Sequence, residues 1–289
     1  MSSNSIQAIL QHHSKQLETA LNLDFSSARI EIQCLLQAVL KVNRAYLLTH
    51  PEQSLDVEQH ARYMELFERR LRGEPIAYLL GEREFYGLIF KVSPATLIPR
   101  PETELLVEHA LQHILPDGTS RVLDLGTGSG AIALSIAHAR PDVEVVAVDA
   151  STAALEVARF NAQRLGLNNV RLLQGDWFSA LGGERFDIIV ANPPYIAAND
   201  AHLAQGDVRF EPRSALASGV DGLDDIRRIC TQARTHLNVN GWLLLEHGYD
   251  HATQVRALLQ QEGFMDVFSA RDLAGIERIS GGRNSQLSK

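Results

Sequence analysis

The first quarter of the chain has apolar residues spaced as in amphipathic helices. In residues 28–40, ARIEIQCLLQAVL, apolar positions recur at three- and four-residue spacings, and no glycine occurs before Gly73. This spacing places the apolar side chains on one face of each helix. We therefore predict a bundle of short helices and assign residues 1–80 to an N-terminal helical domain.

Residues 81–98 depart from this helical spacing. The segment Phe85-Tyr86 precedes Gly87, and Leu88-Ile89-Phe90 with Lys91-Val92 follows it. Such runs around a glycine turn predict a β-hairpin, which would connect the helical domain to the rest of the chain. A helix is expected to begin soon afterwards, at Pro101, because proline suits the first turn of a helix.

Short apolar runs alternate with helical stretches from residue 99 to residue 289. The predicted strands are RVLDL (121–125), VEVVAV (143–148), VRLL (170–173), DIIVA (187–191) and WLLLE (242–246). Nearly continuous apolar strands are typical of a parallel sheet that is buried on both faces. Their alternation with helices predicts an open, doubly wound α/β domain.

A glycine-rich loop follows the first of these strands and precedes a helix. It has the sequence DLGTGSGA from Asp124 to Ala131, and Asp149 comes directly after the second strand. Small residues let backbone N–H groups approach a ligand closely, and a carboxylate such as Asp149 can accept hydrogen bonds from both ribose hydroxyls of an adenosine. The pattern fits a dinucleotide fingerprint and the loop of S-adenosylmethionine-binding methyltransferases equally well, and a tight turn without ligand is the plain alternative.

Asp176 and Trp177 follow the third predicted strand, at the sheet edge where ligands bind in folds of this kind. The Asp176 carboxylate is placed to accept a hydrogen bond from an exocyclic adenine amine, and the Trp177 ring to pack on the base. A tryptophan buried in the hydrophobic core would give the same pattern, so both interpretations of Trp177 stay open.

The tetrapeptide Asn192-Pro193-Pro194-Tyr195 directly follows the fourth predicted strand. Neither proline has an N–H, so the backbone hydrogen bonds of the parallel sheet end here. The carbonyls of Asn192 and Pro193 are therefore held outside the sheet. With the Asn192 side-chain oxygen they form acceptors for a planar NH2 group. Accepting both N–H bonds turns the nitrogen lone pair toward a methyl donor without prior ionisation, while Tyr195 would pack over the target. A simple turn is the alternative interpretation.

Composition and charge exclude several classes of function. The 289 residues include 27 Lys and Arg against 35 Asp and Glu, a net charge of −8, which argues against broad nucleic-acid binding.

We also expect no segment that directs the protein to a membrane or out of the cell. The longest candidate apolar run, residues 131–139, is shorter than the roughly 18 residues of a membrane span, and the N-terminus does not resemble a secretory signal. Two distant cysteines, Cys34 and Cys230, favour a reducing cytoplasm. His109 and His113 have no third ligand at metal-site spacing, so no metal site is predicted.

The glycine loop followed by Asn-Pro-Pro-Tyr resembles S-adenosylmethionine-dependent methyltransferases that act on planar nitrogens. Three more segments resemble the PrmC (HemK) family: GEPIAYLLG (73–81), LIPRPETE (97–104) and FEPRSAL (210–216). Enzymes of that family methylate the N5 amide of the glutamine in the Gly-Gly-Gln motif of bacterial peptide chain release factors. The resemblance implies a mostly parallel, seven-stranded sheet of the S-adenosylmethionine-dependent methyltransferase type, with a small helical bundle and a connecting hairpin before it.

The resemblance also implies the residues of the site. Those expected to bind S-adenosylmethionine are Gly126, Thr127, Gly128, Ser129, Gly130, Asp149, Trp177 and Asn192. The glutamine would be held by Asn192, Pro193, Pro194 and Tyr195, of which Asn192, Pro193 and Tyr195 would be the catalytic set. The helical domain would dock the release factor, and the segment 197–221, long for a connection of this kind, is expected to close over the glutamine.

Three other functions share part of this pattern. A DNA adenine-N6 methyltransferase would use the same amine clamp, but the acidic net charge and the lack of an evident basic stripe disfavour it. A ribosomal-protein glutamine methyltransferase resembles the chain less at residues 99–104. A nicotinamide oxidoreductase would explain the glycine loop but leaves Asn-Pro-Pro-Tyr without a role. We expect neither a stable nucleic-acid partner nor a membrane association.

Overall fold

A computed structural model describes residues 4–116 and 120–285, so the outermost residues of the predicted first and last domains lie outside it. The chain forms two compact units. One consists of the chain up to Gly81 together with Ala204–Phe210, and the other of Glu82–Leu203 and the chain from Glu211 onward. The sequence pattern does not predict that residues 204–210 belong with the helical unit.

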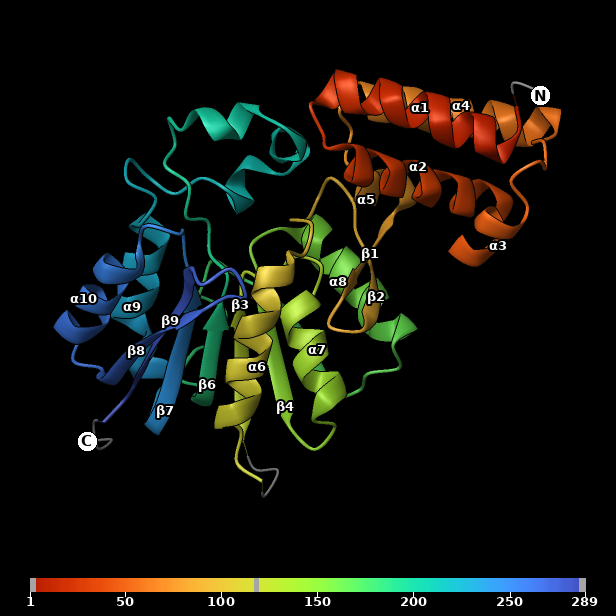
Figure 1. Ribbon diagram of the computed structural model, residues 1–289. Coiled ribbons are helices and arrows are strands. Elements are labelled where there is room, and N and C mark those ends of the chain that lie inside the picture. Colours follow the sequence, from red (N-terminus) through yellow and green to blue (C-terminus); the bar gives the residue numbers. More distant parts are fainter. Residues whose placement is uncertain (1–3, 117–119, 286–289) are drawn as a thin grey trace. The chain divides into compact units, whose positions relative to one another are not determined.

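The first unit is a bundle of helices. They are α1 (Ile6–Leu21), α2 (Phe25–Leu40), α3 (Arg44–Thr49), α4 (Val57–Leu71) and α5 (Ile76–Leu80) (Figure 1). The first four begin after a polar residue whose side chain accepts a backbone N–H of the first turn: Ser5, Asp24, Asn43 and Asp56. These caps satisfy donors that a helix start leaves unpaired. Apolar side chains of α1, α2 and α4 form the core, which confirms the predicted helical bundle.

A buried guanidinium ties residues 204–210 to this bundle. The Arg70 side chain is only 3% exposed, and its Nε and Nη2 donate to the Glu31 carboxylate at 2.7 and 3.0 Å. Its Nη1 donates to Asp207 Oδ1 at 2.9 Å and to the backbone carbonyls of Gly73 and Glu74. Two carboxylates thus compensate for the water that the guanidinium loses on burial.

Replacing Arg70 with leucine is expected to destabilise the helical unit by about 3 kcal/mol, because Glu31 is left half-buried without its partner. Hydrogen exchange of the backbone amides of α2 and α4 measures this change. The matched control is Arg69→Leu, which removes a more exposed pair with Glu74 and is expected to cost at most about 1 kcal/mol. Equal effects of the two substitutions would contradict the stabilising role of Arg70.

The second unit contains a seven-stranded sheet with the strand order β5-β4-β3-β6-β7-β9-β8. Its strands are β3 (Arg121–Leu125), β4 (Glu144–Asp149), β5 (Val170–Gln174), β6 (Phe186–Ala191), β7 (Leu237–Glu246), β8 (Met265–Arg271) and β9 (Glu277–Arg283). The first five are parallel, whereas β9 runs antiparallel to both β7 and β8. The predicted doubly wound, mostly parallel, seven-stranded sheet is confirmed.

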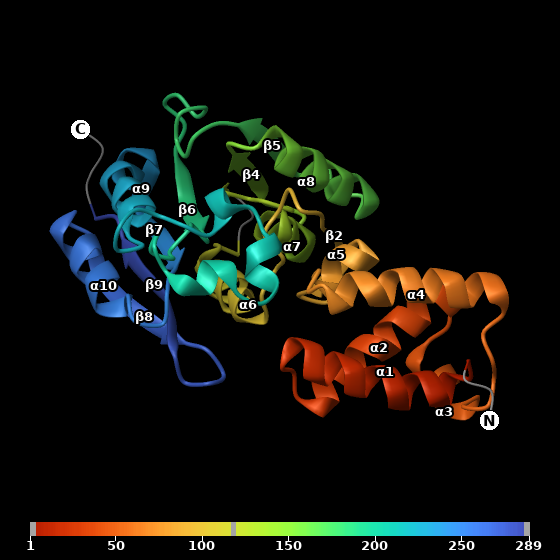
Figure 2. The same cartoon turned by 90° about the horizontal axis from the view of Figure 1, so that it is seen from above.

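Helices cover both faces of this sheet (Figure 2). The helices α6 (Glu104–His113), α7 (Ala131–Ala139) and α8 (Thr152–Arg164) pack on one face, and α9 (Asp224–His236) and α10 (Ala252–Gln261) on the other. Successive strand residues point to opposite faces, so Val122 joins the core beneath α7 while Leu123 joins the core beneath α9. No helix in the described ranges is long and apolar enough to cross a membrane.

The predicted hairpin lies in the second unit as β1 (Glu82–Phe85) and β2 (Leu88–Lys91). Its apolar residues Phe85 and Phe90 belong to the α7-side core. In the described part of the chain, four short 3-10 helices lie in the connections: Pro101–Thr103, Ala201–Ala204, Asp207–Phe210 and Arg213–Ala215. The helix predicted to begin at Pro101 therefore starts as a 3-10 turn and continues as α6.

Candidate functional site

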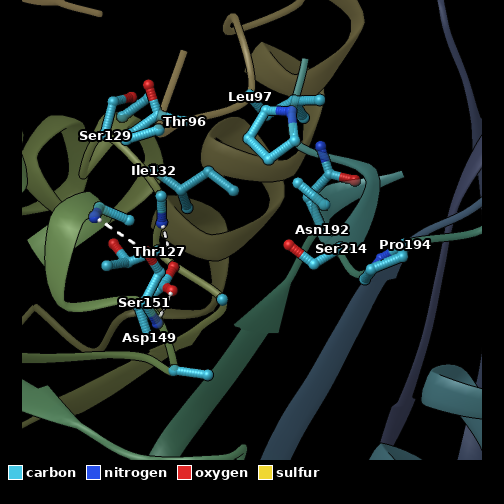
Figure 3. A pocket seen from close by; sticks show the side chains of 18 of the residues that line it. Thr96, Leu97, Thr127, Ser129, Ile132, Asp149, Ser151, Asn192, Pro194 and Ser214 are labelled. Carbon is cyan, nitrogen blue, oxygen red and sulfur yellow. Dashed lines mark hydrogen bonds between the residues drawn. The ribbon is translucent and has the colours of Figure 1, made fainter. Parts of the chain in front are cut away.

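A cavity of about 410 Å³ lies where β3, β4 and β6 end (Figure 3). This is the size of a small-molecule site, and the carboxyl edge is where doubly wound sheets bind ligands. The cavity brings together most of the predicted site residues, namely Gly126, Thr127, Gly128, Ser129, Asp149, Trp177, Asn192 and Pro194. The other three, Gly130, Pro193 and Tyr195, are not among the residues that line it.

Two positions of the loop require glycine, each for a different structural reason. Gly126 has a φ of +74°, and a Cβ there would lie 3.3 Å from the Trp177 ring. Gly130 has a φ of +84° at the start of α7, and a Cβ there would lie 2.9 Å from Leu134 Cδ1. A side chain at position 126 would therefore press on the Trp177 ring at the cavity. A side chain at position 130 would clash with Leu134 in the first turn of α7.

The Asp149 carboxylate holds the glycine loop against the end of β4. Its Oδ2 accepts a hydrogen bond from Gly128 N at 2.8 Å, and its Oδ1 accepts one from Ser151 N at 2.8 Å. Burial raises the pKa of Asp149, while the N–H groups of Ser151 and Gly128 lower it. Each oxygen retains a lone pair, so Asp149 can still accept a hydrogen bond from a ligand in the cavity.

Asp124 supports the same loop from below. Its Oδ2 accepts hydrogen bonds from Thr127 Oγ1 at 2.6 Å and from Ala133 N at 3.2 Å, while its Oδ1 is buried with no hydrogen-bond partner among the residues that the structure describes. Burial raises the pKa of this fully buried carboxyl to about 7, against the lowering effect of Thr127 and Ala133. These two hydrogen bonds make Asp124 a cap of the glycine loop.

The raised pKa of Asp124 makes stability depend on pH. A carboxyl whose pKa is higher in the folded state binds its proton more tightly there, so stability falls as pH rises from about 4 toward 7. Asp124→Asn keeps an oxygen for Thr127 and Ala133 but cannot ionise. The free energy of unfolding of this variant should therefore fall less steeply with pH than that of the unsubstituted protein. The two slopes should differ by up to about 1.4 kcal/mol per pH unit.

Urea unfolding between pH 5 and pH 8 measures this difference. The exposed carboxylate of Asp142, which pairs with Arg140, provides the control substitution Asp142→Asn. That control should show the same slope as the unsubstituted protein in this range. Parallel curves for Asp124→Asn and the unsubstituted protein would refute the assignment.

Trp177 lies beside the glycine loop at the cavity wall. Its backbone has a φ of +52°, and its Nε1 donates to Asp225 Oδ1 at 3.1 Å. The neighbouring Asp176 also lines the cavity, but its carboxylate accepts a hydrogen bond from Arg228 at 2.8 Å. Trp177 is therefore partly buried against the core beneath α9 and also lines the cavity, and its packing on an adenine base stays a prediction.

The amide of Asn192 has a defined orientation. Its Nδ2 donates to Thr103 Oγ1 at 3.3 Å, which leaves Oδ1 as an acceptor for a ligand. Figure 3 shows Asn192 across the cavity from Thr127 and Asp149. The strand β6 ends at Ala191, just before this residue, as expected from the two prolines that follow Asn192.

Tyr195 packs behind the cavity, against the core beneath α9. Its hydroxyl donates to Glu246 Oε1 at 3.3 Å. Burial raises the pKa of the fully buried Glu246 carboxyl to about 7, while hydrogen bonds from Thr103 and Tyr195 lower it. The pKa of Tyr195 is raised, chiefly by its own burial and then by the Glu246 charge.

Within the segment 197–221, residues 204–210 belong to the helical unit, and residues that follow them line the cavity. Glu211 has a fully buried side chain that accepts hydrogen bonds from Ile98 N at 3.0 Å and from the Arg100 guanidinium. This anchor places Pro212, Ser214 and Ala215 at the cavity wall. The closure of this segment over a bound glutamine stays a prediction.

Sequence reasoning missed two residues that contact the Asn-Pro-Pro-Tyr segment. Thr103 lies in the 3-10 turn before α6 and lines the cavity, and Glu246 is the last residue of β7. A signal for Glu246 was available, because a carboxylate that ends an apolar strand lies at the ligand-binding edge. Thr103 had no comparable signal, since its neighbour Asn192 is far away in the sequence.

Comparisons with known proteins decide the family. The PrmC N-terminal domain matches residues 8–81, and the methyltransferase small domain matches residues 101–210. The release factor glutamine methyltransferase of Salmonella typhimurium is 51% identical over 260 residues, which are 90% of this chain and 94% of that protein. This chain belongs to the release factor glutamine methyltransferase family. The family member from Bordetella pertussis is 54% identical over 255 residues, 88% of this chain and 94% of that protein.

A solved structure outside these close relatives shares the fold. A methyltransferase from Pyrococcus furiosus superimposes with a TM-score of 0.53 at 21% identity, over 76% of this chain and 98% of that protein. At this level of identity the likeness concerns the fold. The family assignment rests instead on the close relatives.

Proposed function

We propose that this protein transfers a methyl group from S-adenosylmethionine to the side-chain amide nitrogen of the glutamine in the Gly-Gly-Gln motif of peptide chain release factors. One observation carries the proposal. A single cavity has the glycine loop and Asp149 on one side and the free Oδ1 of Asn192 on the other. Family membership supplies the substrate, since the relatives carry the name release factor glutamine methyltransferase.

The residues around the cavity fit an adenosyl cofactor. The φ angles at Gly126 and Gly128 are positive, and a Cβ at Gly128 would meet nothing within 4 Å, so the backbone faces open space. Asp149 has lone pairs for ribose hydroxyls, and the Trp177 ring offers an apolar surface to a base. S-adenosylmethionine supplies an electrophilic methyl group on a positively charged sulfur.

The groups around Asn192 orient the glutamine rather than ionise it. Asn192 Oδ1 and the Pro193 carbonyl accept the two N–H bonds of the substrate amide, so its lone pair faces the methyl group. As the new C–N bond forms, the C–S bond of the sulfonium breaks and leaves a neutral thioether. The nitrogen then releases its proton to solvent, so no strong base is needed. Positioning and fixed dipoles account for the rate enhancement.

Several features belong to the same proposal. The helical unit docks the release factor, and the segment 197–221 closes over the inserted glutamine. Tyr195 shields the amide from water, although its hydroxyl is held by Glu246. A cytoplasmic location is part of this proposal, because the substrate acts in translation termination.

Labelled S-adenosylmethionine tests the function directly. The protein is incubated with the methyl-labelled cofactor and a bacterial release factor, and the label is located by peptide mass spectrometry. We expect the label on the glutamine of Gly-Gly-Gln and none on a release factor with alanine at that position. Parallel incubations replace the release factor with duplex DNA or with ribosomal protein, and label found there instead would replace the proposed function with one of the two related activities.

A further inference from the structure

The indole of Trp177 is fixed at both of its ends. Its six-membered ring lies so close to the glycine loop that a Cβ on Gly126 would be 3.3 Å from Cζ3 and 3.6 Å from Cη2. On its five-membered ring, Nε1 donates a hydrogen bond to Asp225 Oδ1 at 3.1 Å. Because Trp177 also lines the cavity, an indole held at two points presents a surface of defined orientation to a ligand there.

The Asp225 carboxylate is itself held by a buried serine. Ser218 Oγ donates to Asp225 Oδ2 at 2.7 Å and accepts a hydrogen bond from Asp225 N at 2.9 Å. Ser218 N donates in turn to the carbonyl of Ile196, the residue after Asn-Pro-Pro-Tyr, at 2.9 Å. Asp225 thus connects the Trp177 indole to a fixed part of the backbone and uses one oxygen for each neighbour.

The surroundings of Asp225 favour a charged acceptor. It lies in the first turn of α9, where the positive end of the helix dipole stabilises a carboxylate. Arg228 Nη1 lies 3.7 Å from its Oδ1, while Arg228 Nη2 donates to Asp176 at 2.8 Å. A hydrogen bond from an indole N–H to an ionised carboxylate is stronger than one to a neutral acceptor.

We propose that Asp225 is a positioning residue for S-adenosylmethionine, which holds the Trp177 indole as a flat wall for the adenine ring. Asp225 lines the cavity, but each of its oxygens already accepts a hydrogen bond, so it acts through Trp177 Nε1. Trp177 has a φ of +52°, a conformation that residues with a side chain rarely adopt, and the hydrogen bond compensates for it. This inference rests on the proposed function, since it needs an adenosyl group in the cavity.

Three single variants and one double variant test the proposal through the Kd for S-adenosylmethionine, measured by calorimetry. Asp225→Leu removes the acceptor and should raise the Kd about tenfold, the effect of losing one hydrogen bond to a charged group. Asp225→Asn keeps an oxygen for Nε1 and should stay within about threefold. Trp177→Phe keeps a ring without the N–H and should raise the Kd at least about tenfold.

The double variant separates positioning from direct contact with the cofactor. Once Trp177→Phe has removed the N–H, Asp225→Leu should raise the Kd by no more than a further twofold or so, since both changes break one connection. The kcat at saturating cofactor and release factor should stay within about threefold in all variants, because the Asn192 side of the cavity is intact.

Nuclear magnetic resonance tests the same contact without cofactor. The chain has two tryptophans, so ¹⁵N-labelled indoles give two N–H resonances, and Trp242→Phe assigns that of Trp177. In Asp225→Leu this N–H should lose its hydrogen-bonded chemical shift and exchange faster with water, whereas Asp225→Asn should keep both properties. Asp224→Leu, at the neighbouring exposed carboxylate that pairs with Arg227, is the matched control and should change neither the resonance nor the Kd.

Several outcomes would overturn the proposal. An unchanged Kd in Trp177→Phe would do so even if Asp225→Leu fails to fold. Losses that multiply in the double variant, or a Kd of Asp225→Asn as high as that of Asp225→Leu, would show that Asp225 binds the cofactor itself. Cofactor binding without methylation of a release factor would overturn the proposed function alone, whereas no cofactor binding at all would overturn both.

Discussion

Asn192→Ala is expected to lower kcat for release-factor methylation by roughly 10³-fold, the upper range for loss of one preorganised polar group. The alanine removes Oδ1, the acceptor that the Thr103 hydrogen bond turns toward the cavity. Without it, the substrate amide can rotate, and its lone pair no longer faces the methyl donor. Single-turnover methylation at saturating cofactor and release factor measures the loss.

Cofactor binding should respond much less to the same substitution. Asn192 lies across the cavity from the glycine loop and Asp149, so the Kd for S-adenosylmethionine should rise by less than about tenfold. Asn168→Ala removes an exposed asparagine elsewhere in the same unit and should change neither quantity. Equal losses of turnover and cofactor affinity in Asn192→Ala would show that Asn192 serves the cofactor rather than the glutamine.

Asp149→Ala is expected to weaken S-adenosylmethionine binding about 100-fold, or about 2.8 kcal/mol. The change removes the acceptor proposed for the ribose hydroxyls. It also frees Gly128 N and Ser151 N, which the carboxylate holds at 2.8 Å, so the glycine loop loses its anchor. Isothermal titration calorimetry with S-adenosylmethionine measures the affinity.

Turnover at saturating cofactor provides the internal comparison for this variant. It should fall by less than about tenfold, because the Asn192 side of the cavity is intact. Asp142→Ala, at an exposed carboxylate before β4, should leave the affinity unchanged. An unaltered cofactor Kd in Asp149→Ala would remove Asp149 from the cofactor site.

Five of the seven strands of the sheet could be predicted from apolar runs, and the last two could not. The parallel strands are buried on both faces, which gives continuous apolar runs such as that of β6. The strand β8 has a mixed, partly exposed pattern, and β9 contains Gly281 and Gly282. A Cβ at Gly281 would lie 2.6 Å from Leu244 Cδ2, so close packing against β7 requires the residue that weakens the strand signal.

For the site as well, residues marked by a local sequence pattern could be predicted, whereas contacts between residues distant in the sequence could not. The glycine loop, Asp149 and Asn192 each follow a predicted strand, and parallel strands bring their carboxyl ends to one edge. Tyr195 was expected at the substrate because it adjoins Asn192, yet its hydroxyl contacts Glu246 behind the cavity. Its partner lies on β7 and depends on strand pairing that no local pattern encodes.

The passage of residues 204–210 through the helical unit has a consequence for dissecting this protein into fragments. A cut after Gly81 would leave Arg70 with Glu31 but without Asp207, so the buried guanidinium of the isolated helical fragment would lose one of its hydrogen-bond acceptors. The complementary fragment would carry a seven-residue excursion with nothing to fold against. Exchanging the helical part between relatives therefore calls for exchanging Ala204–Phe210 with it.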